Sequence, residues 1–179
     1  MSEWESPYHT TPIQPADAKA GFACGNHSLD DFFARHAVAN DAAGVCRVYV
    51  RRREADDDPS LPGILGFYTL SMASAEAAPV AQILGKKLPN YAMPVALIGR
   101  LAIDQRVQGR GLGEKLLLDA LRRVVTVAAN VGCTGVVVDA KDEGATRFYA
   151  NYGFVVVVSE GWPRRMFLPI SVARDAFAP

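Results

Sequence analysis

The chain has 179 residues, a length that suits one compact domain or one domain with a modest extension. Hydrophobic residues make up 50% of it and charged residues 21%, a balance that excludes wholesale disorder. The 19 basic and 19 acidic residues give a formal net charge of zero, which argues against a generic polyanion-binding domain but leaves room for a local basic patch.

The N-terminal segment, MSEWESPYHTTP, is polar and contains prolines, unlike a signal peptide. No apolar run approaches the roughly 20 residues that a membrane-spanning helix needs. The three cysteines, Cys24, Cys46 and Cys133, are far apart and form no CxxC pair, a pattern typical of a reduced intracellular protein. We therefore expect a soluble cytoplasmic protein.

The first half of the chain predicts a helix followed by a β-hairpin. Ser28 is a candidate N-cap for a helix whose apolar pattern ends near Gly44. Residues 46–51 and 64–72 alternate like strands, and the acidic, turn-forming segment between them favours a hairpin. A further helix is expected within residues 73–88.

A buried strand and a long amphipathic helix are predicted next. Residues 95–103 form a nearly continuous apolar run, as expected of a strand that is buried on both faces. Beyond a glycine-rich turn, apolar side chains recur at three- and four-residue spacing as far as Gly132, a typical C-terminal glycine. The apolar face comprises Leu117, Ala120, Leu121, Val124, Ala128 and Val131, and the polar side comprises Lys115, Asp119, Arg122, Arg123 and Asn130.

The last third of the chain predicts one more strand, a short helix and a closing hairpin. The segments are a buried strand at 135–140, a helix at 143–152, and strands at 154–159 and 164–170. No linker or internal repeat interrupts this order. We therefore predict one mixed α/β domain that spans residues 1–179.

The turn between strand 95–103 and the long helix has the composition of an anion site. Glycines let a backbone approach a ligand closely, and the N–H groups of a first helical turn attract an anion. Glycine-rich turns can also be simple connectors, but the basic and amide side chains here favour phosphate binding. The glycines are Gly109, Gly111 and Gly113, and the flanking polar residues are Arg106, Gln108 and Arg110.

A dinucleotide site is an alternative interpretation of this turn. Such a site requires GxGxxG and an acidic residue at the end of the next strand, where Asp139 stands. The spacing here is GxGxG, however, and no second βαβ half follows. A P-loop needs GK[ST], which this turn lacks.

Residues 106–111 (RVQGRG) match the [QR]xxGx[GA] signature, and the sequence here resembles the GNAT acetyltransferases. Residues 95–103 resemble the central strand of that family, and residues 145–154 (ATRFYANYGF) resemble its C-terminal motif. The resemblance implies an α/β (α+β) fold with a mixed, mostly antiparallel sheet flanked by helices. Residues 95–103 and 135–140 would be its splayed parallel pair, and acetyl-CoA would be the co-substrate. His9, His27 and His36 show no metal-binding spacing, so we expect no metal.

The resemblance also implies roles for individual residues. Tyr149 would protonate the leaving thiolate, although a tyrosine there could equally be packed core. A backbone N–H near Ala102 or Ile103 would polarise the thioester carbonyl. The residues implied in acetyl-CoA binding are Leu101, Ala102, Ile103, Arg106, Val107, Gln108, Gly109, Arg110, Gly111, Leu112, Gly113 and Phe148.

No residue stands out as a general base. Asp142 and Glu143 could serve, but both are equally good helix-start charges. An acceptor α-amino group, with a pKa near 8, would need no base. We expect direct attack of the amine on the thioester, without a covalent enzyme intermediate.

The first half resembles a narrower group, the GNAT toxins of toxin–antitoxin pairs. The matching segments are 22–25 (FACG), 29–32 (LDDF), 47–50 (RVYV), 66–71 (GFYTLS) and 99–102 (GRLA). This likeness implies acetylation of the α-amino group of aminoacyl-tRNA, a ribbon-helix-helix antitoxin and a homodimer.

Basic residues bear on this acceptor prediction. Arg100, Arg51 and Lys86 belong to basic segments that could contact the acceptor. Two alternatives stay open: a GNAT enzyme that acetylates a small amine or a protein N-terminus, and a non-catalytic module that only binds coenzyme A.

Overall fold

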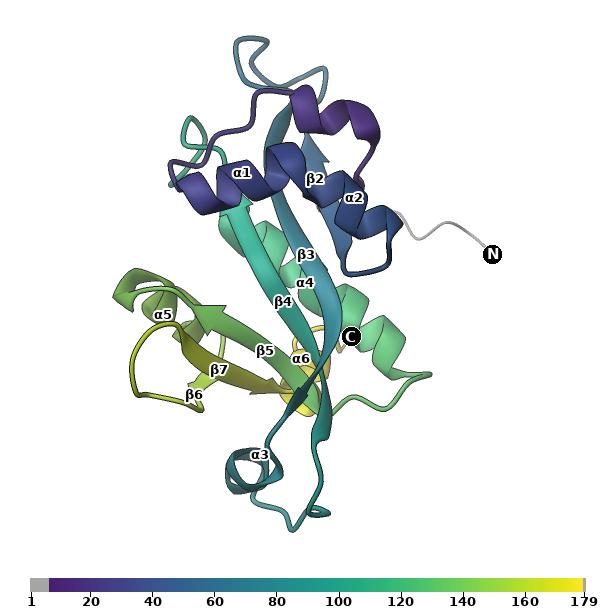
Figure 1. Cartoon of the computed structure of the whole chain (residues 1–179), viewed down its shortest axis with the longest axis vertical. Helices are drawn as coiled ribbons and strands as arrows, with labels where there is room; N and C mark the ends of the chain where they lie inside the picture. The colour runs from purple at the N-terminus through teal and green to yellow at the C-terminus, as the bar shows by residue number, and fades with distance from the viewer. Residues whose placement is uncertain (1–6, 179) are drawn as a thin grey trace. The chain divides into compact units, whose positions relative to one another are not determined.

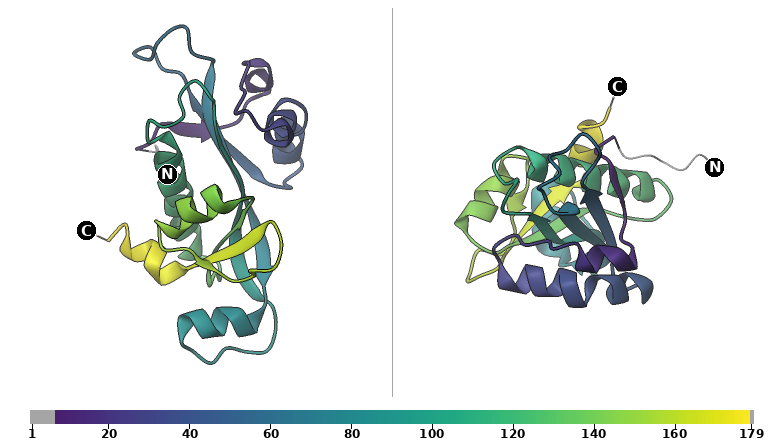
Figure 2. Two further views of the ribbon diagram at one scale, coloured as in Figure 1. Left: turned by 90° about the vertical axis from the view of Figure 1, so that its left-hand side faces the viewer. Right: turned by 90° about the horizontal axis from the view of Figure 1, so that it is seen from above.

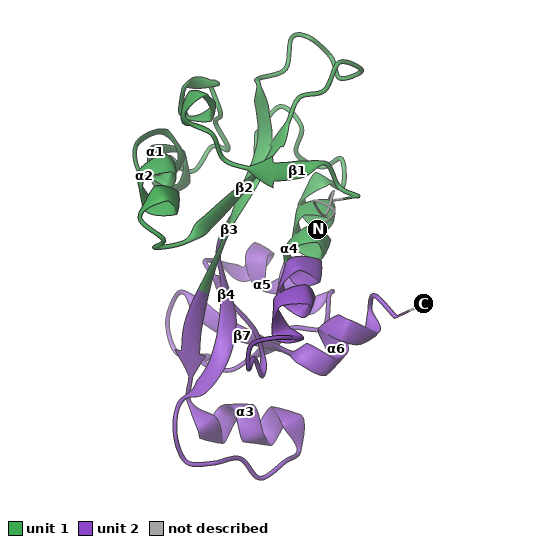
Figure 3. Cartoon of the chain, turned by 90° about the vertical axis from the view of Figure 1, so that its right-hand side faces the viewer, with its two compact units in different colours: residues 1–71, 100–120 green, residues 72–99, 121–179 purple. Residues whose placement is uncertain are grey.

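The computed structural model describes residues 7–178. Residues 1–6 and 179 lie outside the described part. The prediction that residues 1–12 are not a signal peptide therefore falls partly outside the described residues. The chain divides into two compact units (Figure 3). Unit 1 comprises residues 1–71 and 100–120, and unit 2 comprises residues 72–99 and 121–179.

Seven strands and seven helical segments lie in the described residues (Figure 1). In chain order they are β1 (Thr10–Pro12), η1 (Pro15–Lys19), α1 (His27–Arg35), α2 (Ala37–Ala42), β2 (Arg47–Arg52), β3 (Ile64–Ala75), α3 (Ala77–Leu84), β4 (Met93–Ile103), α4 (Leu112–Ala128), β5 (Gly135–Ala140), α5 (Glu143–Ala150), β6 (Val155–Val156), β7 (Arg164–Pro169) and α6 (Ile170–Asp175). The strand order in the sheet is β1-β2-β3-β4-β5-β7-β6.

Unit 1 is built on the predicted hairpin. Strands β2 and β3 pair antiparallel, with Val48 opposite Thr69 and Val50 opposite Phe67. Helices α1 and α2 lie on one face of these strands and the start of α4 lies on the other (Figures 2 and 3). Phe33 from α1 packs on Phe67 with ring centroids 4.8 Å apart, which anchors the helices to the strands.

Two details of the first helix differ from the prediction. Asn26, not Ser28, is the N-cap, because its side-chain oxygen accepts a hydrogen bond from the Leu29 N–H at 3.1 Å. The helix is also interrupted at His36, which separates α1 from α2. The apolar face nevertheless continues across this break, since Ala37 of α2 is fully buried in the same core as Phe32 and Phe33 of α1.

Unit 2 contains the one parallel strand pair found in the described residues. Strand β5 pairs parallel with β4 from Val95–Gly135 to Ile98–Val138, and antiparallel with β7 along its whole length. The pairing with β4 ends at Val138, whereas Asp139 and Ala140 of β5 continue to pair with β7. This mixed sheet with flanking helices confirms the predicted fold class.

Helix α3 is shorter than the stretch 73–88 that was predicted. Strand β3 continues to Ala75, and the helix ends at Leu84. Val80 of α3 is fully buried against Val137 and Phe167, which face each other across β5 and β7. Helix α6, which the sequence analysis did not predict, contacts β5 and β7 and contributes the buried Ala173.

The polar side predicted for α4 contains an error. Asp119 is fully buried and its carboxylate accepts hydrogen bonds from the Thr10 and Tyr68 hydroxyls. The helix ends at Ala128 rather than near Gly132, and Val131 is 52% exposed. Helical spacing placed Asp119 on the solvated side because it cannot register Thr10 and Tyr68, polar partners that are distant in sequence. It placed Val131 on the apolar face, although the helix ends three residues before it. No described helix is long and apolar enough to cross a membrane.

Candidate active site

The turn between β4 and α4 has the backbone of an anion site. Gly109 and Gly111 adopt φ angles of 74° and 78°, in the left-handed region that glycine tolerates best. No atom lies within 4 Å of the position that a Cβ would take at either residue. Helix α4 begins at Leu112, so its first N–H groups follow an exposed and unobstructed stretch of backbone.

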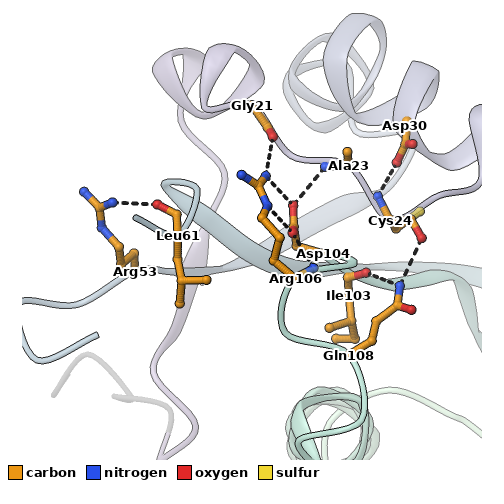
Figure 4. A network of polar contacts seen from close by, with 10 residues as sticks. All are labelled: Gly21, Ala23, Cys24, Asp30, Arg53, Leu61, Ile103, Asp104, Arg106 and Gln108. Carbon is orange, nitrogen blue, oxygen red and sulfur yellow. Dashed lines mark hydrogen bonds and ion pairs between the residues drawn. The ribbon is translucent and has the colours of Figure 1, made fainter. Parts of the chain in front are cut away.

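Arg106 supports this turn through Asp104, a fully buried residue that the sequence analysis did not single out. The guanidinium donates from Nε to Oδ1 at 2.9 Å and from Nη2 to Oδ2 at 3.0 Å. It also donates to the Gly21 carbonyl at 3.1 Å, while Asp104 accepts from the Ala23 N–H (Figure 4). The turn is thereby tied to the segment that precedes α1.

The same contacts set the charge state of the pair. Burial by itself would raise the pKa of Asp104, but the hydrogen bonds from Arg106 and Ala23 outweigh it and leave the pKa below its usual value. The hydrogen bond to Asp104 raises the pKa of Arg106 in turn. Both groups are therefore ionised at neutral pH.

Gln108 supplies a second support for the turn. Its Nε2 donates to the Cys24 carbonyl at 3.0 Å and to the Ile103 carbonyl at 2.9 Å (Figure 4). The Cys24 N–H in turn donates to Asp30 at 2.7 Å, which fixes the segment before α1. The side chains of Arg106 and Gln108 thus hold the turn, whereas the Arg110 side chain is exposed.

The end of β4 is packed closely against β3 within unit 1. A Cβ at Gly66 would stand 2.9 Å from the Leu116 side chain and 3.0 Å from the Ala102 carbonyl oxygen, so only glycine fits there. Ala102 and Val107 are buried, whereas Leu101 and Ile103 are half-buried. Leu112 and Gly113, at the start of α4, are also half-buried.

Tyr149 lies on α5 in unit 2 and is 9% exposed. The rings of Phe148 and Phe154 stand 5.2 Å and 5.5 Å from its ring, both at steep angles. Burial raises the pKa of Tyr149 to about 12, so its phenol keeps its proton at neutral pH. Phe148 is half-buried and also contacts Tyr152.

The two carboxylates considered as general bases have structural partners. Asp142 caps α5 by accepting a hydrogen bond from the Ala145 N–H at 2.7 Å. Glu143 pairs with Arg164 at 3.0 Å. Both residues therefore act at the start of α5, which was the alternative that the sequence left open.

Asp139, the residue that favoured a dinucleotide site, also has a structural partner. Arg165, its neighbour across β5 and β7, donates to both carboxylate oxygens at 2.8 and 2.9 Å. A carboxylate held in this way offers little to a ribose hydroxyl, which removes the main support for the dinucleotide interpretation. Within residues 7–178, no group of three or more His, Cys, Asp or Glu side chains could hold a metal ion.

The basic residues predicted to contact the acceptor have different surroundings. Arg51 is 14% exposed and pairs with Glu54 and Asp57, so its charge is compensated inside the hairpin. The Arg100 guanidinium lies 3.7 Å above the centre of the Phe32 ring in unit 1. Lys86 is exposed just after α3 in unit 2.

The end of β4, the left-handed glycines of the turn and the N-terminus of α4 together form a backbone site for a phosphate-bearing ligand. Residues 49–154 match the Acetyltransferase (GNAT) family, and the chain belongs to this family. It is an acetyl-CoA-dependent N-acetyltransferase.

One relative and two solved structures of a second relative, AtaT, show where in the family this chain lies. It is 33% identical over 174 residues to the tRNA-acetylating toxin of Mycobacterium tuberculosis, with 97% of each chain covered. The structure of AtaT complexed with acetyl-methionyl-tRNAfMet has a TM-score of 0.79 at 30% identity, covering 94% of this chain and 98% of that one. A tyrosine-to-phenylalanine variant of AtaT, bound to the C-terminus of the antitoxin AtaR and to acetyl-CoA, has a TM-score of 0.75 at 27% identity, covering 95% and 98%.

Proposed function

We propose that this acetyltransferase modifies the α-amino group of aminoacyl-tRNA. The observation that carries the proposal is the end-to-end similarity to a tRNA-acetylating toxin, with 97% of both chains aligned. The AtaT complex with acetyl-methionyl-tRNAfMet supports it at 30% identity. Blocking the α-amino group of a charged tRNA would prevent it from accepting a peptide, which is the action of a translation-blocking toxin.

Acetyl-CoA would be held by backbone rather than by long side chains. We assign its pyrophosphate to the N–H groups of residues 108–113, because the side chains of Arg106 and Gln108 already hold the turn. The exposed Arg110 side chain would add charge from solvent. We assign the pantetheine arm and the thioester carbonyl to the backbone of residues 101–103 at the end of β4.

Tyr149 is the proposed proton donor. As the acceptor nitrogen forms its bond to the acetyl carbon and the carbon–sulfur bond breaks, the phenol donates to the leaving sulfur. The amine releases one proton to solvent and the phenol regains one, so the protons balance. The pKa of about 12 keeps the donor loaded at neutral pH. The acceptor amine, with a pKa near 8, needs no general base.

The cellular location, the oligomeric state, the protein partner and the domain organisation are part of the same proposal. We propose a cytoplasmic toxin that forms a homodimer and is bound by a ribbon-helix-helix antitoxin. The AtaT structure with the C-terminus of the antitoxin AtaR supports such a partner. We also propose that both units form one domain over residues 1–179, because β3, β4 and α4 each run through both units.

Radiolabelled acetyl-CoA tests this proposal when it is mixed with the enzyme and bulk charged tRNA. Label should enter charged tRNA and be absent from the same tRNA after deacylation. No label in any charged tRNA, together with turnover of a polyamine or a protein N-terminus, would overturn the tRNA assignment and favour a small-amine or N-terminal acetyltransferase.

A further inference from the structure

Residues 155–162 run from β6 into the loop that leads to β7 (Figure 1), and they include three large apolar side chains that are exposed. Val155, Val158 and Trp162 are 48%, 49% and 47% exposed within eight residues. Exposed apolar side chains this close together in the chain are candidates for contact with a ligand or partner. Nothing in the acetyl-transfer chemistry described above uses this segment.

Trp162 is held in place by Arg164. The Arg164 guanidinium carbon lies 4.2 Å from the centre of the indole ring, within cation–π distance. The guanidinium covers one face of the ring, so the exposed surface of Trp162 lies mainly on the other face and the edges. The indole is thus a flat and partly open platform backed by a positive charge.

Arg164 also connects this platform to the helix that carries Tyr149. Its Nη1 donates to the Glu143 carboxylate at 3.0 Å, at the start of α5. Tyr149 follows Glu143 by six residues on the same helix, about 9 Å along the helix axis. Trp162, Arg164, Glu143 and Tyr149 all belong to unit 2.

The hydrogen bonding of Arg164 is incomplete within the described residues. Its Nε is buried and has no hydrogen-bond partner there. In its neighbour Arg165, by contrast, Nε and Nη2 both donate to the Asp139 carboxylate. A buried donor without a partner costs stability, so this edge of Arg164 would gain from a further hydrogen-bond partner.

We propose that Trp162, backed by Arg164, stacks on the unpaired 3′-terminal nucleobase of the acceptor, and this inference rests on the tRNA acceptor proposed above. Unpaired RNA bases are recognised by stacking on aromatic rings and guanidinium planes. In aminoacyl-tRNA the terminal base is separated from the α-amino group only by one ribose and the aminoacyl ester. A base held at this platform would therefore position the amine by its own covalent connection.

Tryptophan fluorescence measures the contact directly. The chain has two tryptophans, Trp4 and Trp162, so the W4F variant reports on Trp162 alone. A short single-stranded RNA ending in adenosine should quench this emission, and the same RNA with an abasic 3′ end should not. Equal quenching by both, or quenching by neither, would overturn the proposal.

Steady-state kinetics separate the platform from a merely structural role. Trp162→Ala should raise the KM for charged tRNA about tenfold with kcat nearly unchanged, and Trp162→Phe should restore most of the affinity. Arg164→Lys, which keeps the charge but loses the guanidinium plane, should raise KM several-fold. The matched controls are Val131→Ala, a comparably exposed valine just after α4, and Arg174→Gln, an exposed arginine on α6, and both should behave like wild type.

The two proposals fail in different ways. If wild-type enzyme acetylates no charged tRNA, the acceptor assignment fails. If it acetylates charged tRNA and Trp162→Ala, shown to be folded by its circular dichroism and its unchanged affinity for acetyl-CoA, keeps the wild-type KM, then the stacking platform alone is wrong.

Discussion

Arg106 and Asp104 are joined by two hydrogen bonds, from Nε to Oδ1 at 2.9 Å and from Nη2 to Oδ2 at 3.0 Å. Asp104 is fully buried, and the pair links the glycine turn to the Gly21 and Ala23 backbone. The arginine of the [QR]xxGx[GA] signature is thus a support for the turn. This assignment separates the roles of Arg106 and Arg110, which the sequence pattern alone does not distinguish.

Arg106→Gln should therefore affect the stability of the fold, and Arg110→Gln should affect the affinity for acetyl-CoA. Arg106→Gln should lower the urea midpoint of unfolding, because it leaves the buried Asp104 carboxylate without its charged partner. Arg110→Gln should leave the midpoint unchanged and raise the Kd for acetyl-CoA several-fold, because an exposed cation near a phosphate contributes modestly. Urea denaturation and isothermal titration calorimetry measure the two effects. Equal stability of the two variants would contradict the supporting role of Arg106.

Asp104 should make the free energy of unfolding depend on pH in the acidic range. The pKa of its carboxyl is lower in the folded chain than the ordinary 3.8, so its contribution is complete above that value and is lost as pH falls through the folded pKa. Asp104→Asn should destabilise the protein by about 1–3 kcal/mol at pH 7, and by progressively less below about pH 4. Urea midpoints measured from pH 7 to pH 3 should converge for the two proteins. Asp56→Asn, an exposed change, is the control, and parallel curves for Asp104→Asn would refute the linkage.

The left-handed glycines of the turn give a sharp comparison. Gly111→Ala places a Cβ in open space but forces alanine to a φ of 78°, at a cost of about 1–2 kcal/mol. The turn should relax away from this geometry, and the KM for acetyl-CoA should rise. Gly132→Ala also places its Cβ in open space, and Gly132 is not among the positive-φ glycines, so it should match wild type. An unchanged KM for Gly111→Ala would show that the left-handed backbone is unnecessary for binding.

Tyr149→Phe should reduce kcat by about 10²-fold, the usual contribution of a proton donor, with little change in the KM for acetyl-CoA. Tyr152→Phe, a half-buried tyrosine just beyond the same helix, is the control. Because the pKa of Tyr149 is about 12, the donor stays protonated across pH 6–10. The wild-type rate should rise as the acceptor amine loses its proton near pH 8 and then level off. A fall in rate between pH 9 and 10 would contradict a donor with so high a pKa.

Much of the fold follows from local pattern. The hairpin of β2 and β3 and strand β5 could be predicted because their alternation or apolar runs lie between clear turn residues. Two short family motifs, residues 106–111 and 145–154, indicated the glycine turn and Tyr149. These features depend on residues that are neighbours in sequence, which is where pattern arguments are strongest.

The errors and omissions involve partners that are distant in sequence. Asp119 was expected on a solvated face, yet it is buried because Thr10 and Tyr68 donate hydrogen bonds to it. Asp104 was overlooked although it directly follows β4 and stands two residues before Arg106. An acidic residue at the end of a buried strand is the signal that could have identified it. Trp162 and Arg164 are only two residues apart, but their cation–π contact follows from no helical or strand periodicity and so could not be predicted.

The most direct test of the account identifies the acetylated atom when several acceptors compete. The enzyme would be given acetyl-CoA with charged tRNA, spermidine and a peptide that has a free N-terminus, all in one reaction. After nuclease digestion, mass spectrometry would compare the 3′-terminal aminoacyl-adenosine with the other two products. We expect N-acetylated aminoacyl-adenosine as the main product, and its absence alongside acetylated spermidine or peptide would contradict the tRNA acceptor.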